Sequence, residues 1–244
     1  MDPLSRCSLL CVSLGLLLPA CASGGLRGGG SSITNEQLVQ RNRALEQLVV
    51  QALEPCKAKG KPQDHGIIMV TARPDGSLRI GEMQWLGSDE MRQCIQTEAP
   101  KARLAAWPGP SVTWIWAVGT KESPAPTALS EPPASYRERV MEHVQRAQAR
   151  IGGAADASSG PLAACAQRTL PPEAYALVTY KLFIFPQGKV VGVTPLASEG
   201  DGRDPAYMDC VAETVREWTF DPFSGPGFTT LDVPLKYGVN PAEK

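Results

Sequence analysis

The chain has 244 residues, with 24 lysines and arginines against 25 aspartates and glutamates, and a formal net charge of −1 at pH 7. That length accommodates two domains of ordinary size. The basic residues are not clustered, so the composition argues against recognition of a phosphate backbone, and we expect no nucleic-acid partner.

The N-terminal segment predicts export. Leu9 to Leu18 form an aliphatic-rich stretch that is shorter than the roughly 20 residues a helix needs to span a bilayer, and this length is typical of a signal peptide. The Leu-Pro-Ala-Cys sequence at 18–21 resembles the lipobox of bacterial lipoproteins, in which the cysteine is acylated after cleavage. We therefore predict a signal peptide over 1–20 and a lipid anchor on Cys21. Cleavage as a plain secretory signal is the alternative.

The next segment predicts a tether between the membrane and the first domain. Residues 21–35 are rich in glycine and serine, and a flexible chain of this length reaches about 20 Å. Alanine follows the lipobox cysteine where aspartate would direct retention. By analogy with the enterobacterial sorting rule, this favours the periplasmic face of the outer membrane.

Residues 36–119 predict a first domain. It begins with an amphipathic helix and continues with a β-hairpin over 66–81, whose turn is Pro-Asp-Gly. A second helix, capped by Ser88, and a strand over 112–118 follow. The apolar face of the first helix consists of Leu38, Leu45, Val49, Ala52 and Cys56.

The same order of elements returns after a proline-rich linker over 120–135. The second domain, 136–238, has an amphipathic helix, a hairpin over 178–193 with a Pro-Gln-Gly turn, and a helix that begins after Asp204 with a proline at its first position. A short tail over 239–244 ends the chain. The apolar face of its first helix consists of Tyr136, Val140, Val144, Ala147 and Ile151.

Equal spacing identifies the two domains as an internal repeat. A Gly-Pro pair follows Cys94 by 15 and 16 residues, and another follows Cys210 by the same distance. An earlier cysteine, Cys56 or Cys165, precedes the hairpin in each half.

The second half resembles the AgmX/PglI C-terminal domain of myxobacterial proteins, a relative of the TonB C-terminal domain. The resemblance depends on the early cysteine, the Pro-x-Gly hairpin, Cys210 with Val211, Trp218 with Phe220, and a strand with Pro234 between two aliphatics. It is looser over 36–119, where alanine and leucine replace the tryptophan and phenylalanine. It implies an α+β fold of two tandem TonB-C-like domains, each a helix–hairpin–helix–strand unit with a small sheet packed on helices. It also implies a non-catalytic role, in a family linked to gliding motility and envelope complexes.

The remaining cysteines predict two disulfides. Four cysteines in an oxidising compartment permit three connectivities. Equivalence of the repeats requires Cys56–Cys94 and Cys165–Cys210, with free buried thiols as the alternative.

The sequence offers no recognisable catalytic or metal-binding motif. Neither His65 nor His143 lies at ligand spacing from a cysteine, and both are expected on the solvated surface. No nucleophile elbow, phosphate loop or dinucleotide fingerprint is present. We therefore predict a protein that is not an enzyme and needs no cofactor or metal, with a site of unrecognised facing carboxylates as the least favoured alternative.

The hairpins predict one apolar face and one mixed face in each sheet. Ile68 and Val70 share their face with the equivalent Tyr180 and Leu182. The opposite face is mixed, and we expect it to be partly exposed. It consists of Ile67, Met69, Thr71 and Arg73 in the first copy and Thr179, Lys181, Phe183 and Phe185 in the second.

Trp114 and Trp116 lie on one face of the last strand of the first domain, and two alignments compete for them. Without a gap they correspond to Thr230 and Asp232, on a solvent face that could bind a partner. With one residue inserted in the second copy they correspond to Leu231 and a valine, which places them in the core.

These observations favour a protein-binding or scaffold lipoprotein of the envelope. A strand at the edge of a small sheet can accept a strand from an envelope protein. Proline in a sheet is confined to edges and bulges, so the last strand, with Thr230, Asp232 and Pro234, is the candidate docking strand. A purely structural lipoprotein without a docking edge is the alternative.

Overall fold

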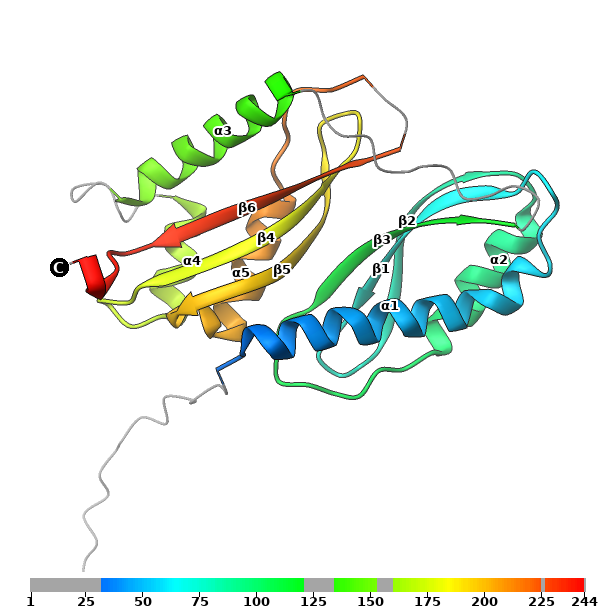
Figure 1. The fold of residues 1–244 in the computed structure, drawn as a ribbon, viewed down its shortest axis with the longest axis horizontal. Helices are drawn as coiled ribbons and strands as arrows, with labels where there is room; N and C mark the ends of the chain where they lie inside the picture. Colours follow the sequence, from blue (N-terminus) through cyan, green and yellow to red (C-terminus); the bar gives the residue numbers. More distant parts are fainter. Residues whose placement is uncertain (1–31, 121–133, 153–159, 225–226, 244) are drawn as a thin grey trace, which may run out of the picture.

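The computed structural model describes residues 32–120, 134–152, 160–224 and 227–243 (Figure 1). It has an α+β fold with two small antiparallel sheets, each partly covered by helices. The predicted signal peptide, Cys21, most of the tether and most of the linker lie outside the described residues.

The first half of the chain forms a sheet with the strand order β2-β1-β3. Its elements are α1 (Asn35–Lys57), β1 (His65–Ala72), β2 (Leu78–Leu86), α2 (Asp89–Glu98), η1 (Ala99–Lys101) and β3 (Val112–Gly119).

The second half repeats this topology with the strand order β5-β4-β6. Its elements are α3 (Ala134–Gly152), α4 (Pro161–Thr169), β4 (Ala176–Ile184), β5 (Val190–Gly200), η2 (Asp201–Arg203), α5 (Pro205–Arg216), β6 (Thr229–Tyr237) and η3 (Pro241–Glu243).

Both hairpin turns depend on a glycine. Gly76 and Gly188 have φ values of 81° and 82°, which L-residues with a side chain rarely adopt. Each glycine carbonyl accepts a hydrogen bond from the segment after the second helix, from Leu104 N–H at 2.9 Å and from Phe220 N–H at 2.9 Å. A Cβ atom on Gly76 would overlap the carbonyl oxygen of Leu104, and one on Gly188 would overlap the carbonyl oxygen of Phe220. The glycine therefore fixes the turn and lets the later segment lie against it.

The disulfides join the pairs expected from the repeat. Cys56 on α1 is bonded to Cys94 on α2, and Cys165 on α4 is bonded to Cys210 on α5, with Cα–Cα distances of 5.4 and 5.6 Å. Their sequence separations are 38 and 45 residues. A loop of that length stabilises the folded state by about 4 kcal/mol in the chain-entropy view.

The helices differ from the sequence prediction in two places. The first copy has one continuous helix up to its cysteine, whereas the second divides this region into α3 and α4, with Cys165 on α4. On α1 the buried position is Leu53, and the predicted Ala52 is only half-buried. Both predicted N-cap positions are correct. The Asp204 carboxylate accepts a hydrogen bond from Tyr207 N–H at 2.8 Å, whereas the Ser88 side chain makes no cap hydrogen bond to α2.

Helix α1 contributes to both hydrophobic cores. Its first turns insert Leu38 into the core of the second domain, while Leu45 and Val49 pack into the core of the first. Just before the helix, Ile33 N–H donates to the Arg203 carbonyl at 3.0 Å. Asn35 Oδ1 accepts a hydrogen bond from Ser198 N–H, near the end of β5, at 2.7 Å. One helix therefore holds the two domains together (Figure 1).

A third apolar cluster fills the space between the two sheets. The Phe183 ring lies edge-on to Trp114, with ring centroids 5.7 Å apart, and the Thr194 hydroxyl donates to the Thr113 carbonyl on β3. The buried members of this interdomain cluster are Ile67, Ile115, Phe183, Phe185, Val191 and Phe228. The expectation of a partly exposed mixed face is therefore wrong at Ile67, Phe183 and Phe185, because these side chains pack between the two sheets. It is correct for the rest of that face, which is half-buried or exposed: Met69, Thr71, Arg73, Thr179 and Lys181.

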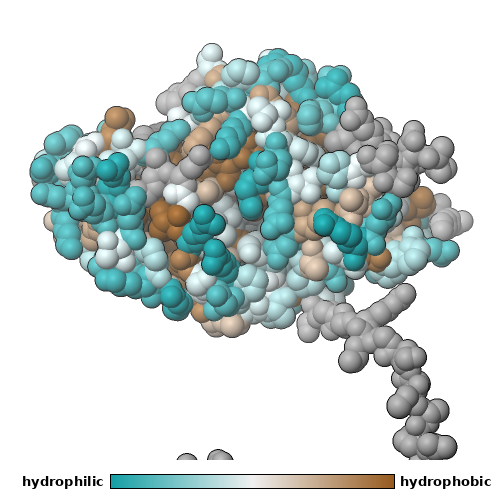
Figure 2. All heavy atoms as spheres, turned by 180° about the vertical axis from the view of Figure 1, so that it is seen from behind, coloured by the Kyte–Doolittle hydropathy of each residue, from teal (hydrophilic) through white to brown (hydrophobic). Residues whose placement is uncertain are grey.

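The face of the molecule seen from behind in Figure 2 is mainly polar. Seen from behind, hydrophobic residues form small patches separated by hydrophilic ones (Figure 2). The most exposed large hydrophobic side chain in the described part of the chain is Leu86, at 65%.

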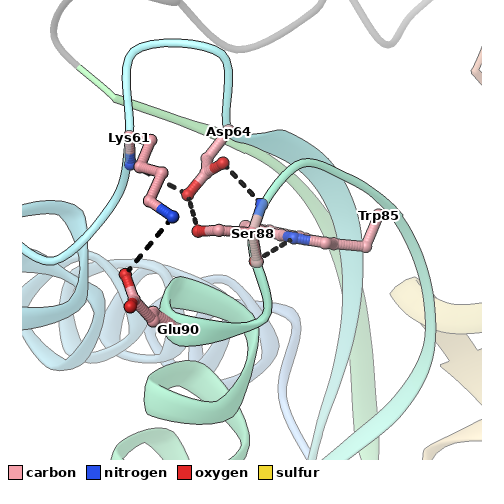
Figure 3. A network of polar contacts seen from close by, with 5 residues as sticks. All are labelled: Lys61, Asp64, Trp85, Ser88 and Glu90. Atoms are coloured by element: carbon pink, nitrogen blue, oxygen red, sulfur yellow. Dashed lines mark hydrogen bonds and ion pairs between the residues drawn. The ribbon is translucent and has the colours of Figure 1, made fainter.

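A buried aspartate ties β1 to the start of α2 (Figure 3). Asp64 is fully buried, and its carboxylate accepts hydrogen bonds from the Ser88 N–H at 2.7 Å, the Ser88 hydroxyl and the Lys61 N–H at 2.9 Å. Burial alone would raise the pKa of Asp64, but the Ser88 and Lys61 hydrogen bonds outweigh it and hold the pKa below its usual value. The Trp85 indole N–H donates to the Ser88 carbonyl at 2.9 Å and closes the network.

We predict that Asp64→Asn lowers the free energy of unfolding by about 1–3 kcal/mol at pH 7. The amide of asparagine has one acceptor oxygen in place of two, so it cannot accept all the hydrogen bonds that the carboxylate accepts from Ser88 and Lys61. Since the folded-state pKa of Asp64 is depressed, its stabilisation is present above the unfolded-state pKa of about 4 and is lost as the pH falls through the folded-state value. Urea unfolding should show the gap between wild type and variant narrowing below about pH 4. A gap that is constant with pH would contradict this role.

Candidate functional site

The two sheets present four outer strands, and the domain interface involves two of them. β3 lies against β5, whose Thr194 and Ser198 bond to the first domain and to α1 respectively. The outer strands that lie away from this contact are β2 and β6.

β6 has the pattern of a strand with one buried and one outward face. Leu231, Val233 and Leu235 are buried in the core of the second domain. On the other face, the predicted docking residues Asp232 and Pro234 are exposed, and Thr230 is half-buried.

The surroundings of β6 are partly polar and partly helical. Asp232 forms an ion pair with Lys181 on the adjacent strand, with Nζ 2.9 Å from Oδ1. Helix α3 runs alongside β6 (Figure 1) and buries Tyr136 and Val140 in the same core. Helix α3 therefore packs with the buried side chains of β6, whereas Asp232 and Pro234 lie on the opposite face.

The other outer strand is β2, and a further pairing lies just before its first residue. Ser77 forms an isolated antiparallel bridge with Arg103, which covers the beginning of the strand. Its register with β1 is broken between Ile68 and Val70. A bulge of this kind twists the strand and interrupts its row of backbone hydrogen-bonding groups, so β2 is the poorer template for an added strand.

Trp114 and Trp116 lie on the face of β3 that packs on the core of the first domain. Trp114 pairs with Val70 as Leu231 pairs with Leu182 in the second copy, so the alignment with one inserted residue is the correct one. Both indoles are half-buried against the core of the first domain. The Trp114 N–H donates to Asn42 Oδ1 on α1 at 3.1 Å, which fixes the ring.

A cleft of about 740 Å³ lies between the hairpin of the first domain and helix α5 of the second. Arg73, Arg79 and Arg216 line it together with two carboxylates, so its charge is mixed. One of these, Asp209, accepts a hydrogen bond from Ser111 N–H across the interface at 2.9 Å. Burial raises the pKa of Asp209, which this hydrogen bond partly opposes.

The two histidines lie in different surroundings. His65 opens β1, and its Nδ1 lies 2.8 Å from the Gln63 carbonyl oxygen. His143 was expected in solvent, but its ring packs against Trp218 and Phe220 with centroids 5.4 and 5.1 Å away. In the part of the chain that the structure describes, no three His, Cys, Asp or Glu residues form a group that could hold a metal ion.

Sequence reasoning missed a buried arginine at the domain junction. Arg41 is only 7% exposed, and its guanidinium donates to the Ala105 carbonyl at 2.6 Å and to the Arg73 carbonyl at 3.0 Å. It also lies over the Trp107 ring, 5.1 Å from the centroid. Its helical position, between Leu38 and Leu45 on the apolar face, was the available signal.

Comparison with known proteins returns no relative: no family model, no curated protein and no solved structure matches the chain. Within the described residues, no helix combines the length and apolar character needed to cross a bilayer.

Proposed function

We propose that this chain is a non-catalytic envelope lipoprotein that binds a partner polypeptide by strand addition to β6. We further propose that its halves are tandem TonB-C-like domains of the AgmX/PglI type, in a motility or transport assembly. The shared strand order and the equivalent glycine turns support the tandem arrangement.

The observation that carries the proposal is the position of β6. It is a nine-residue outer strand on the side of the second sheet opposite β5, the strand that contacts the first domain. An outer strand away from an interface can pair with an added strand, which gains affinity from main-chain hydrogen bonds.

The backbone of β6 indicates which donor a partner would use. Asp232 and Pro234 are two residues apart, so their backbone nitrogens point to the same side of the strand. A proline nitrogen is tolerated on the side that makes no ladder hydrogen bond. We therefore expect the Asp232 N–H to point away from β4 and toward an incoming strand.

A structural role is the second candidate, and the domain interface favours it. The first domain and α1 cover β5, and a buried apolar cluster joins the sheets. A lipoprotein of this kind would stabilise an envelope complex as a rigid body without a docking edge.

We predict that Asp232→Pro weakens capture of the partner from envelope extract by about tenfold, because it removes a main-chain donor. Asp232→Asn is the matched control, since it also breaks the ion pair with Lys181 but keeps the N–H. Circular dichroism should show that both variants fold. Equal capture by the two variants would exclude β6 and favour the structural role.

Lipid anchoring through Cys21, on the periplasmic face of the outer membrane, is the other part of the proposal. Acylation should place the wild type in the detergent phase on partition, and Cys21→Ser should move essentially all of it to the aqueous phase. Mass spectrometry of the mature N-terminal peptide provides the direct measurement. An unacylated peptide that begins at residue 22 or later would refute the anchor.

A further inference from the structure

The two disulfides occupy equivalent positions but differ in their exposure. In the first domain both sulfur-bearing residues are buried, with Cys56 at 0% and Cys94 at 6% exposure. In the second domain Cys165 is at 0%, whereas Cys210 is only partly buried. A thiol from solution can therefore approach the second disulfide from the side of Cys210.

An arginine contacts the second disulfide. Arg168 follows Cys165 by one turn of α4, and its Nη2 atom lies 2.8 Å from Cys210 Sγ and 3.9 Å from Cys165 Sγ. Its Nε atom donates to the Ala164 carbonyl at 3.2 Å, which holds the guanidinium in place. The Thr214 hydroxyl oxygen lies 3.5 Å from Cys165 Sγ, and the hydroxyl donates to the Cys210 carbonyl at 3.0 Å.

The first disulfide lacks these neighbours. Lys59 follows Cys56 by the same three residues, but in the described structure no hydrogen bond joins its side chain to either sulfur. Glu98 occupies the position equivalent to Thr214, and its carboxylate pairs with Lys101 at 2.8 Å. A guanidinium beside a sulfur favours the thiolate, and among the described residues it is the second disulfide that has one within hydrogen-bond distance.

A cation beside a disulfide affects how readily the disulfide reacts with a thiol. Reduction produces thiolates, so a fixed cation beside the sulfurs stabilises the reduced form and improves the leaving group. Exposed disulfides with a stabilised reduced form are the more easily reduced ones.

We propose that Cys165–Cys210 is a thiol–disulfide exchange site whose reaction partner is a dithiol, such as the active site of a dithiol oxidoreductase. One thiolate of the dithiol attacks Cys210 Sγ, the S–S bond breaks, and Cys165 leaves as a thiolate whose sulfur lies 3.9 Å from Arg168 Nη2. The cation lies closer, at 2.8 Å, to Cys210 Sγ, which becomes a thiolate in the second step. The second thiolate of the dithiol then attacks the mixed disulfide and releases the Cys210 thiolate. The dithiol is oxidised to a disulfide, two electrons pass to the chain, and the two protons lost by the dithiol pass to the new thiols or to solvent. Arg168 is a positioning residue: its fixed positive charge lies beside the two sulfurs and stabilises the thiolates that reduction produces.

The test is graded reduction of the full native chain with dithiothreitol, followed by alkylation and peptide mapping of each cysteine. Cys165 and Cys210 should be reduced at least tenfold faster than Cys56 and Cys94. In guanidinium chloride the two rates should converge, since the difference comes from the fold.

Variants of the two equivalent cationic positions isolate the effect of Arg168. Arg168→Gln should slow reduction of the second disulfide by about three- to tenfold. Arg168→Lys keeps the positive charge, so the second disulfide should be reduced at close to the wild-type rate. Lys59→Gln should leave the rate of reduction of the first disulfide unchanged. Equal native rates for both disulfides, faster reduction of Cys56–Cys94, or no effect of Arg168→Gln would overturn the proposal.

Discussion

Contact between the two sheets around Phe183 is the interaction on which the arrangement of this molecule depends. The Phe183 ring is 2% exposed, although it lies on the face of β4 away from the helices of its own domain. It packs against Trp114 of the first domain and Phe228 of the second, with centroid distances of 5.7 and 5.9 Å. Because this contact brings β3 against β5, it also defines the interdomain cleft and leaves β6 on the far side of the second sheet. The sheet of each domain therefore buries apolar side chains on the mixed face of the other domain's sheet.

The parts of the fold that local chemistry determines could be read from the sequence. The hairpin turns follow from glycines at positions where φ must be positive, and the helix starts follow from Ser88 and Asp204. The disulfide pairs follow from the repeat, since equivalent cysteines must have equivalent partners. These features depend on residues close in sequence or on an internal copy.

The features that escaped prediction depend on contacts between distant segments. The pattern of α1 shows an apolar face but not that its beginning and end belong to different cores. His143 has a polar helical neighbourhood in the sequence, yet Trp218 and Phe220 approach it from a segment some 75 residues later. The mixed hairpin faces were expected partly in solvent because alternation within one strand cannot reveal a second sheet. Of the candidate site, the edge position of β6 was predictable from Pro234, whereas α3 beside it was not.

The repeat also shows how one backbone plan can carry different chemistry. Both domains place a disulfide between a helix before the hairpin and a helix after it, but only the second places a guanidinium on the sulfurs. Similarly, one outer strand of each sheet is used in the domain contact, and the remaining strand differs: β2 has a register break, whereas β6 pairs with β4 without one. The second domain therefore carries the features that suit interaction, and the first domain secures its position.

The most direct test of the coupling between the two domains is equilibrium unfolding in urea, monitored for each peptide by hydrogen exchange and mass spectrometry. Peptides from both halves of the wild type should report one common midpoint, because the sheets and α1 couple the domains. Phe183→Ala removes the ring at the centre of the interdomain cluster, at a cost of about 3–5 kcal/mol. If the cluster couples the domains, the two halves of this variant should unfold at separate midpoints. Separate midpoints already in the wild type, or a single midpoint retained in the variant despite the loss of stability, would contradict this coupling.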